Sequence, residues 1–327
     1  MLAGQNYIPR ASNVIGNVIR DTMVVSVHFS RRDRVVAELL EAKSRKVVSC
    51  FPFFNELDLL EIHLETLDAV VDLFVVTEAK QSHSGLPKPL YLSDNLHRFE
   101  KFRKKLVVQV VDIPQSVALF EADWHQRECA KDLLSEIMHP EDILIYGDVD
   151  EISRPSAILR AIAALDSDSE LQVAHLAQDL FYYYINSREE SGRLLSFMGE
   201  YKGIKKKKWL GTTVNRWSTA QQSKLTELRF PERKERGIRI DYGGWHFSWV
   251  GGAEKAPATE RVALKLENTA HQEFKTRRNQ RKLTRRVLSG KDIVHRRFAK
   301  FKKIEDLSYL PEFVLANLDR FDYLILK

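Results

Sequence analysis

The sequence predicts an α/β protein whose mostly parallel central sheet is flanked by helices. Short apolar runs rich in β-branched residues alternate with segments in which leucines follow helical spacing, and this alternation is typical of a parallel, helix-covered sheet. With 327 residues, 44% of them hydrophobic, the chain is long enough for one large domain with a substantial core. Its two cysteines, Cys50 and Cys129, exclude a disulfide scaffold, and we expect Cys50 to be an inert core thiol.

Residues 1–45 differ from the rest of the chain. We assign them as an N-terminal extension of unknown role, with a strand predicted at 23–29 and a short helix at 34–43. We find no secretory signal and no apolar run of the roughly 18–20 residues needed to span a bilayer, and we therefore expect a cytoplasmic protein. The main domain is predicted at 46–327 and begins with a buried strand at 47–51.

The first helix is predicted to start directly after that strand. Asn55 is expected to cap it, and Glu56 and Asp58 in its first turn are favoured by the helix dipole. Its apolar face is formed by leucines at helical spacing, namely Leu57, Leu60, Leu64 and Leu67. A helix that follows the first strand so closely is also the usual place for a nucleotide to meet backbone N–H groups.

The remaining elements follow in order. We predict a strand at 70–76, a loop rich in Gly and Pro at 82–90 and a helix at 96–104. A strand at 106–111 and a helix at 123–137 follow. Further along, Arg154-Pro155 opens a helix that ends at about Leu165, and a strand is predicted at 171–176. We expect another helix to begin near Ala253-Glu254, and the apolar tail at 307–326 to pack back on the body.

The most distinctive stretch is 143–152, where an apolar, strand-like run stops in three carboxylates, Asp148, Asp150 and Glu151. In a parallel sheet these acids would lie at the carboxyl end of the strand, where ligands bind in open α/β sheets. Residues two apart in an extended segment point the same way, so Asp148 and Asp150 would present two hard oxygen ligands for Mg²⁺ or Mn²⁺ with phosphate completing the shell. Glu151 would face the other side and orient its neighbours. The alternative is a strand followed by an acidic, solvated turn.

A second unusual stretch, 243–252, brackets two tryptophans and one histidine with four glycines. Because neutral imidazole is a good ligand beside carboxylates, His246 is a candidate third metal ligand, and the neighbouring rings could form a platform for a sugar face. The alternative is a structural histidine packed between glycine turns. Glu254, at the expected helix start, is the candidate catalytic carboxylate with Asp241 as its rival, although Glu254 could also simply favour the helix dipole.

Residues 275–303 contain 13 Lys or Arg and one acid, Asp292. Such a run suits a solvated face, and it would equally suit nucleic acid, anionic lipid headgroups or the diphosphate of a lipid-linked acceptor. It lacks the interleaved aromatic residues of single-strand binders apart from Phe298 and Phe301, and we expect no nucleic-acid partner.

Six blocks of the sequence, taken in order, resemble glycosyltransferase family 17. They are FPFFNELDLLEIHL at 51–64, VVDLFVVTE at 70–78, HSGLPKPL at 83–90, DVDEI at 148–152, GWHFS at 244–248 and YLPEFVLANLDRFDYL at 309–324. The resemblance covers 46–327 and implies a GT-A-like fold, a UDP-sugar donor, a divalent metal and inversion at the anomeric carbon. It also implies a nucleotide-sugar half at 46–152 and an acceptor half at 153–327.

Carried over by position, Asp148 and Asp150 match the acidic metal motif of the family, and His246 and Glu254 match its late block. The residues expected on the donor side are Asn55, Glu56, Asp58, Glu78, Lys88, Arg127 and Asp148. The resemblance thus implies metal-dependent transfer of a sugar, with GlcNAc as the expected sugar, to a glycan hydroxyl.

Animal members of the family carry a Golgi membrane anchor, which we do not expect here. A surface polysaccharide or a lipid-linked glycan is therefore the expected acceptor, handled by a cytoplasmic protein in peripheral contact with an anionic membrane surface. Two rivals stay open: a metal-dependent nucleotidyl- or phosphotransferase that uses the same acidic motif, and a non-catalytic nucleic-acid-binding protein that uses the basic run.

Overall fold

The computed structural model describes residues 45–114, 117, 119–190, 208–229, 236–293 and 299–327. These residues belong to one compact unit, Leu40–Lys327. The strand predicted at 23–29 and the helix predicted at 34–43 lie outside the described residues. The division of the main domain into a nucleotide-sugar half and an acceptor half stays a prediction.

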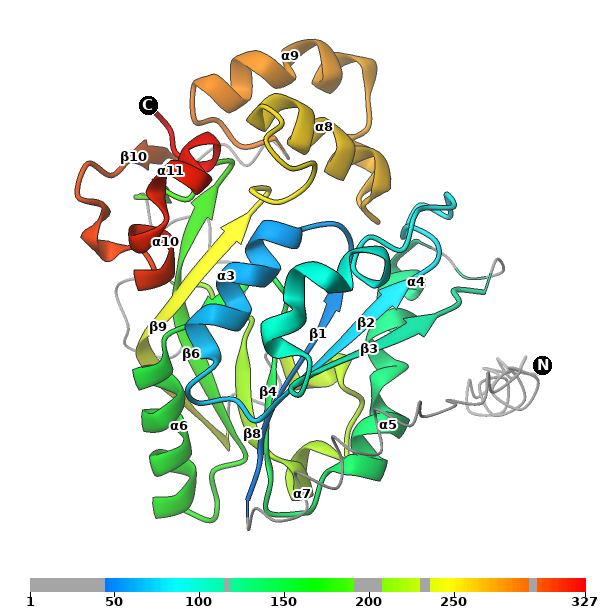
Figure 1. Ribbon diagram of the computed structural model, residues 1–327, viewed down its shortest axis with the longest axis vertical. Coiled ribbons are helices and arrows are strands. Elements are labelled where there is room, and N and C mark those ends of the chain that lie inside the picture. The colour runs from blue at the N-terminus through cyan, green and yellow to red at the C-terminus, as the bar shows by residue number, and fades with distance from the viewer. Residues whose placement is uncertain (1–44, 115–116, 118, 191–207, 230–235, 294–298) are drawn as a thin grey trace, which may run out of the picture. The chain divides into compact units, whose positions relative to one another are not determined.

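Within the described residues a ten-stranded mixed sheet forms the centre of the unit (Figure 1). Four neighbouring strands are parallel, in the order β3 (Leu106–Val111), β2 (Leu73–Ala79), β1 (Val47–Phe53) and β4 (Ile143–Tyr146). The sheet continues from β4 through antiparallel β8 (Thr213–Arg216) to β6 (Val173–Tyr182), β7 (Ser187–Glu189) and β10 (Phe301–Lys303). The long strand β9 (Gly237–Ser248) runs parallel to β6 and pairs with the short β5 (Glu151–Ser153).

Helices bury their apolar faces against this sheet. Residues of α3 (Leu57–Leu67), η1 (Ser93–Phe102) and α6 (Pro155–Ser167) share one core with the parallel strands. All seven residues of β2 are buried, as expected for a strand covered on both faces. The other helices of eight or more residues are α4 (Leu119–Glu128), α5 (Ala130–Ile137), α8 (Ala258–Asn268) and α9 (Arg277–Leu288). The predicted α/β class, with a central sheet flanked by helices, is confirmed.

The short helical segments complete the unit. They are α7 (Trp217–Ala220), η3 (Thr226–Arg229), η5 (Gln272–Phe274), η6 (Leu307–Tyr309), α10 (Glu312–Ala316), α11 (Leu318–Phe321) and η7 (Asp322–Leu324). As predicted, the tail packs back on the body, because Leu310, Val314 and Phe321 join a buried cluster with Leu59 and Ile62 of α3. In the described part of the chain no helix is both long and apolar enough to cross a bilayer.

Several predicted boundaries are wrong in the first half. The strand expected at 70–76 begins only at Leu73, because the N–H groups of Val70 and Val71 bind the Leu67 carbonyl and close α3. Asn55 does not cap α3; the capping position is Glu56, whose carboxylate instead accepts the N–H groups of Phe54 and Asn55. The helix expected at 123–137 is two helices, α4 and α5.

The glycine-rich stretch continues a strand where the structural-histidine alternative placed glycine turns. Gly243 and Gly244 lie inside β9 rather than in turns, because their backbones pass close to β6 and β5. Gly244 has a φ of +138°, and a side chain there would collide with the carbonyl of Ile152. The next helix, α8, begins at Ala258 after Pro257, so Glu254 lies in a loop and not at a helix start.

Candidate functional site

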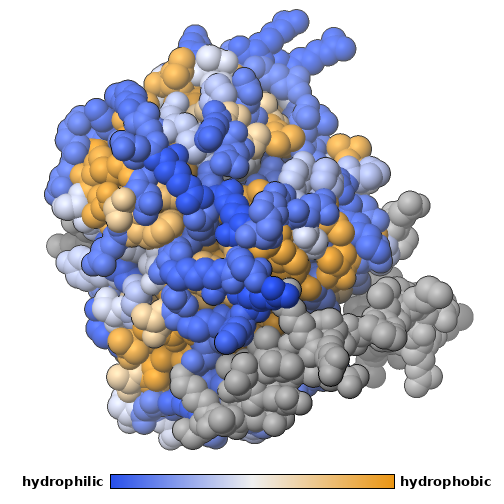
Figure 2. Space-filling model, in the orientation of Figure 1, coloured by the Kyte–Doolittle hydropathy of each residue, from blue (hydrophilic) through white to orange (hydrophobic). Residues whose placement is uncertain are grey.

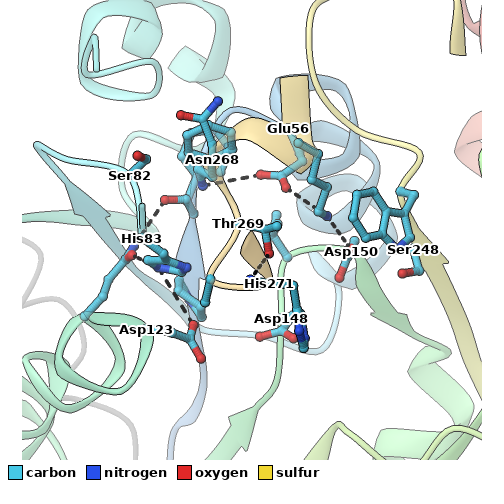
Figure 3. A pocket seen from close by; sticks show the side chains of 18 of the residues that line it. Glu56, Ser82, His83, Asp123, Asp148, Asp150, Ser248, Asn268, Thr269 and His271 are labelled. Atoms are coloured by element: carbon cyan, nitrogen blue, oxygen red, sulfur yellow. Dashed lines mark hydrogen bonds and ion pairs between the residues drawn. The ribbon is translucent and has the colours of Figure 1, made fainter. Parts of the chain in front are cut away.

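A cavity of about 830 Å³ opens at the carboxyl ends of the central strands (Figure 3). Its walls come from the segments after β1, β2 and β4, from α4, from the ends of β6 and β9, and from the stretch that joins α8 to η5. The acidic residues that follow β4 therefore lie where the sequence predicted them, at the edge of the sheet where ligands bind in open α/β folds. The wall of the cavity contains both charged groups and the rings of Tyr182, Trp209, Trp249 and Phe274.

Asp148 is held by two arginines. β4 ends at Tyr146, so Asp148 lies between this strand and a turn at Val149 and Asp150, and the strand does not extend over the two aspartates as predicted. Its Oδ1 accepts hydrogen bonds from Arg127 Nη1 at 2.6 Å and from Arg229 Nη1 at 2.9 Å. Burial acts to raise the pKa of Asp148, but the two guanidinium groups outweigh burial and hold this pKa well below its usual range. Asp148 is therefore ionised at neutral pH.

Glu151 orients the groups around Asp148, Asp150 and itself, which we call the acidic turn, as the sequence suggested. Its fully buried carboxylate accepts hydrogen bonds from Trp209 Nε1 at 2.5 Å and Thr212 Oγ1 at 2.8 Å, and it pairs with Arg229. It also accepts the backbone N–H of Asp148 at 3.3 Å. Burial raises the pKa of Glu151 to about 7, against the lowering effect of Arg229.

Asp150 faces a second set of partners. Its Oδ2 lies 3.2 Å from Lys265 Nζ, and the same ammonium group reaches Glu56 Oε1 at 3.4 Å, so one lysine links two carboxylates of the cavity (Figure 3). Its Oδ1 lies 3.6 Å from His246 Nε2. Burial lowers the pKa of His246 to about 4, which keeps the imidazole neutral at neutral pH and able to act as a ligand.

These residues fit a divalent cation only in combination with other ligands. Asp148 and Asp150 supply hard carboxylate oxygens, and the buried Nδ1 of His246 has no hydrogen-bond partner among the described residues. In that same part of the chain, no three His, Cys, Asp or Glu side chains converge as a complete metal site. A cation held by Asp148, Asp150 and His246 would thus take its remaining ligands from a bound phosphate group, as Mg²⁺ commonly does.

Six of the residues predicted from the sequence line the cavity: Glu56, Lys88, Arg127, Asp148, Asp150 and His246. Lys88 Nζ lies over the rings of Phe54 and Tyr91 and 3.8 Å from Glu78 Oε1. The donor-side residues Asn55, Asp58 and Glu78 are not part of the wall. Glu78 is buried and binds the backbone N–H of Ser93 at 2.9 Å, and Asp58 pairs with Arg98 and Tyr323, so both tie neighbouring segments together.

The two candidate bases also lie outside the cavity wall. The side chain of Glu254 is 50% exposed and lies 3.5 Å from Arg98 Nη1. Asp241 belongs to β9, has a side chain that is 63% exposed, and pairs with Arg239 at 2.6 Å. The structure therefore does not bring either carboxylate to the acidic turn.

The sequence interpretation missed several residues of this site. Arg229 and Lys265 are single basic residues in η3 and α8, and no local pattern marks them. Trp209 packs its ring 4.3 Å from that of His246. Gln126 of α4 binds His83 Nε2 at 2.9 Å and the Thr77 carbonyl at 2.8 Å, which joins the loop at 82–90 to the sheet.

Comparison with known proteins gives a family-level match. The sequence profile of glycosyltransferase family 17 matches residues 37–326. The β-1,4-mannosyl-glycoprotein 4-β-N-acetylglucosaminyltransferases of Homo sapiens and Rattus norvegicus are each 23% identical to the chain over 309 residues. These alignments cover 86% of this chain but 55% and 54% of the two relatives, so the chain spans about half their length.

Solved structures give a weaker match. A complex of the galactosyltransferase LgtC with donor and acceptor sugar analogs is 14% identical, with a TM-score of 0.32, and the match covers 57% of this chain and 64% of that chain. For the mannosyl-3-phosphoglycerate synthase of Rubrobacter xylanophilus the identity is 11% and the TM-score 0.35, with 76% of this chain and 80% of that chain covered.

Proposed function

The chain belongs to glycosyltransferase family 17, and we propose that it transfers N-acetylglucosamine from a UDP-sugar to a hydroxyl group of a glycan acceptor, with inversion and with a divalent cation. The observation that carries the proposal is the cavity itself. Acidic residues that can share a cation and basic residues that can bind phosphate face the same space at the carboxyl edge of the sheet.

The donor diphosphate would lie beside the basic residues of the cavity wall. Lys88 and Arg127 line this wall, and each already faces a carboxylate, Glu78 and Asp148 respectively. Asp148 and Asp150, with His246, would hold the Mn²⁺ or Mg²⁺ ion. When bound, such an ion neutralises the charge that develops on the leaving diphosphate.

The surrounding residues keep this arrangement in place. Glu151 and Arg229 fix the Asp148 side chain and its backbone N–H, while Lys265 fixes the carboxylate of Asp150. Perturbed pKa values gather here, with Asp148 held ionised and His246 held neutral. Such clustering is typical of catalytic sites and supports the assignment.

The acceptor hydroxyl must lose its proton as it attacks the sugar. We propose Glu254 as the base, with Asp241 as its rival, on the basis of the resemblance to family 17. Glu254 lies on the loop that continues from the cavity-lining Trp249. Because its carboxylate is outside the wall, Glu254 can take this proton only if the attacking hydroxyl and the anomeric carbon of the donor meet at the side of the cavity next to residues 249–257.

A thermal-shift screen of nucleotide sugars, with and without Mn²⁺, tests the donor and the cation. UDP-N-acetylglucosamine with Mn²⁺ is expected to raise the melting temperature, since a ligand at 100 times its Kd stabilises the native state by about 2.7 kcal/mol. Asp150→Ala should lose the Mn²⁺-dependent part of this shift. The matched control is Asp112→Ala, which removes a half-exposed carboxylate paired with Lys80 on the surface.

Product analysis separates the proposed reaction from its rival. Transfer to a glycan releases UDP, whereas a nucleotidyl- or phosphotransferase would release pyrophosphate or phosphate. Release of pyrophosphate from a nucleotide substrate, or wild-type sugar transfer by Asp150→Ala, would contradict the proposal.

A further inference from the structure

The helix α9 carries a dense and one-sided positive charge. Six of its twelve residues are basic and none is acidic; the basic ones are Arg277, Arg278, Arg281, Lys282, Arg285 and Arg286. The opposite side is buried through Asn279, Leu283 and Val287. Leu283 and Val287 share an apolar cluster with Val262 and Leu266 of α8, so the basic side is the one left facing solvent.

This charge is concentrated and is not part of a general excess. Residues 275–303 hold 13 of the 51 Lys and Arg of the chain but only one of its 45 Asp and Glu. Outside this segment 38 basic residues face 44 acidic ones, so the rest of the chain is net negative. The asymmetry marks this segment of the chain as suited to an anionic partner.

Three of the six basic residues of α9 make no ion pair with the part of the chain that the structure describes. Within the described part of the chain, Arg277, Arg281 and Arg285 have no carboxylate within ion-pair distance, in contrast to Arg98 and Arg320, which pair with Glu61. Neighbouring arginines lower the pKa of Lys282, which shows that like charges repel one another along the helix. Contact with an anionic surface would relieve this repulsion between the basic side chains of α9.

The position of α9 relates it to the cavity. The helix begins three residues after Phe274, which lines the cavity, and it lies along α8, which supplies Lys265 to the same wall. In Figure 2, long hydrophilic side chains project from the end of the molecule where Figure 1 draws α9. Leu288, the last residue of the helix, is 66% exposed beside this charge.

We propose that the exposed face of α9 binds the surface of an anionic lipid bilayer. Clusters of four to eight basic residues on an amphipathic helix are typical of contacts with acidic headgroups. The apolar side of α9 is already buried against α8, so the contact would be electrostatic and salt-dependent, with Leu288 as its one exposed apolar residue. Nucleic acid is the less favoured partner, because α9 contains no aromatic residue on which bases could stack.

Arg277, Arg281 and Arg285 are spaced by four residues and share one stripe of the helix, so they provide the test. Full-length protein is sedimented with phosphatidylcholine vesicles that contain or lack phosphatidylglycerol. The wild type should bind only the anionic vesicles, and binding should weaken as salt rises. Replacing all three arginines with serine should lower the vesicle affinity on the order of 100-fold, since each basic residue near the surface contributes a factor of about five.

A matched control removes the same charge elsewhere. Lys101→Ser, Arg103→Ser and Lys104→Ser change three exposed basic residues at and just after the end of η1. This control should retain most of the vesicle binding, and both triple variants should keep the wild-type melting temperature, since the replaced side chains are exposed. If the α9 triple variant unfolds, the three single variants, each with a loss of about fivefold, replace it.

Three results would overturn the proposal: equal binding to neutral and anionic vesicles, an equal loss in the control variant, or tighter binding of single-stranded RNA than of vesicles at the same salt. The vesicle assay contains neither a nucleotide sugar nor a glycan. Its outcome is therefore independent of the proposed transferase function.

Discussion

Replacing Lys265 with methionine tests whether the acidic turn depends on a buried countercharge. Lys265 Nζ lies 3.2 Å from Asp150 Oδ2 and 3.4 Å from Glu56 Oε1, and the two carboxylate side chains are only 8% and 5% exposed. Methionine keeps much of the aliphatic length of lysine but removes the charge. Both carboxylates would then stay buried without their shared cation.

The expected loss of stability is about 3 kcal/mol. Removing one partner of a buried ion pair costs roughly 3–5 kcal/mol, and we take the lower end because the Lys265 side chain is 24% exposed. Burial acts to lower the pKa of Lys265, but Asp150 and Glu56 outweigh it and raise this pKa above its usual value. A raised lysine pKa stabilises the native state below the unfolded value of about 10.4, and this stabilisation is lost as pH rises through the native-state pKa, so at pH 7 it is fully present.

Urea unfolding at pH 7, followed by tryptophan fluorescence, measures this loss. The control is Lys101→Met, because the Lys101 side chain is 58% exposed and its pair with Glu65 is expected to contribute less than about 1 kcal/mol. Adding Asp150→Asn to Lys265→Met should recover part of the loss, with a coupling energy of roughly 0.5–3 kcal/mol. Equal losses in Lys265→Met and Lys101→Met would refute the reasoning.

Three further predictions concern the segments around the site. His63 Nδ1 lies 3.0 Å from the Val149 carbonyl, and burial lowers the pKa of His63 from 6.5 to about 4. Between these two pH values the native state binds fewer protons than the unfolded state, so it loses about 3 kcal/mol of stability as pH falls through them. His63→Phe should remove this part of the pH dependence in urea titrations, and an unchanged profile would contradict the prediction. Gly244→Ala should lower stability by about 2 kcal/mol or more in the same assay, because a Cβ there collides with the Ile152 carbonyl, and a neutral effect would show that β5 moves freely. Glu254→Gln should keep the thermal shift caused by UDP-sugar but lose sugar transfer by at least about 100-fold, and retained transfer would move the role of the base to another carboxylate.

The positions of parallel strands could be predicted because short apolar runs rich in β-branched residues mark them in the sequence. The strand at 106–111 agrees with its prediction at both ends, and β1 begins at the predicted residue. The error at 70–76 has a simple cause. Val70 and Val71 are β-branched and apolar, yet their N–H groups close the preceding helix, and composition alone does not separate this role from a place in a strand.

The glycine-rich stretch shows a limit of local rules. Glycine usually interrupts a strand, and one of the two interpretations of 243–252 therefore placed turns at its glycines. In the structure β9 passes between β5 and β6 at distances that leave no room for side chains at Gly243 and Gly244. Strands that are distant in sequence crowd these two positions, so only glycine fits there. The local sequence pattern does not indicate this crowding.

The acidic half of the site could be predicted because its residues are neighbours in the sequence. Asp148, Asp150 and Glu151 lie within four residues, so the motif is visible in the sequence. Their basic partners are not, because Arg229 is 81 residues from Asp148 and Lys265 is 115 residues from Asp150. Only the folded chain brings the two sets together.

The pairing of these charges leads to a last prediction, which concerns how a cation and a nucleotide affect each other's binding. The three carboxylates of the acidic turn already face three cations, Arg127, Arg229 and Lys265, and Glu151, with a pKa of about 7, is only partly ionised. A divalent cation alone would have to compete with these basic partners for the carboxylate oxygens, and it would lack the phosphate oxygens needed to complete its shell.

We therefore expect Mn²⁺ and UDP to bind cooperatively. In calorimetric titrations each should bind weakly alone, and each should tighten the other by at least about 10-fold, which corresponds to a coupling free energy of about 1.4 kcal/mol. Asp150→Asn should weaken the coupling, because it removes a proposed ligand of the cation. Tight binding of Mn²⁺ without nucleotide would instead show that Asp148 and Asp150 exchange their basic partners for the cation, and that the balance seen between these charges does not control access to the site.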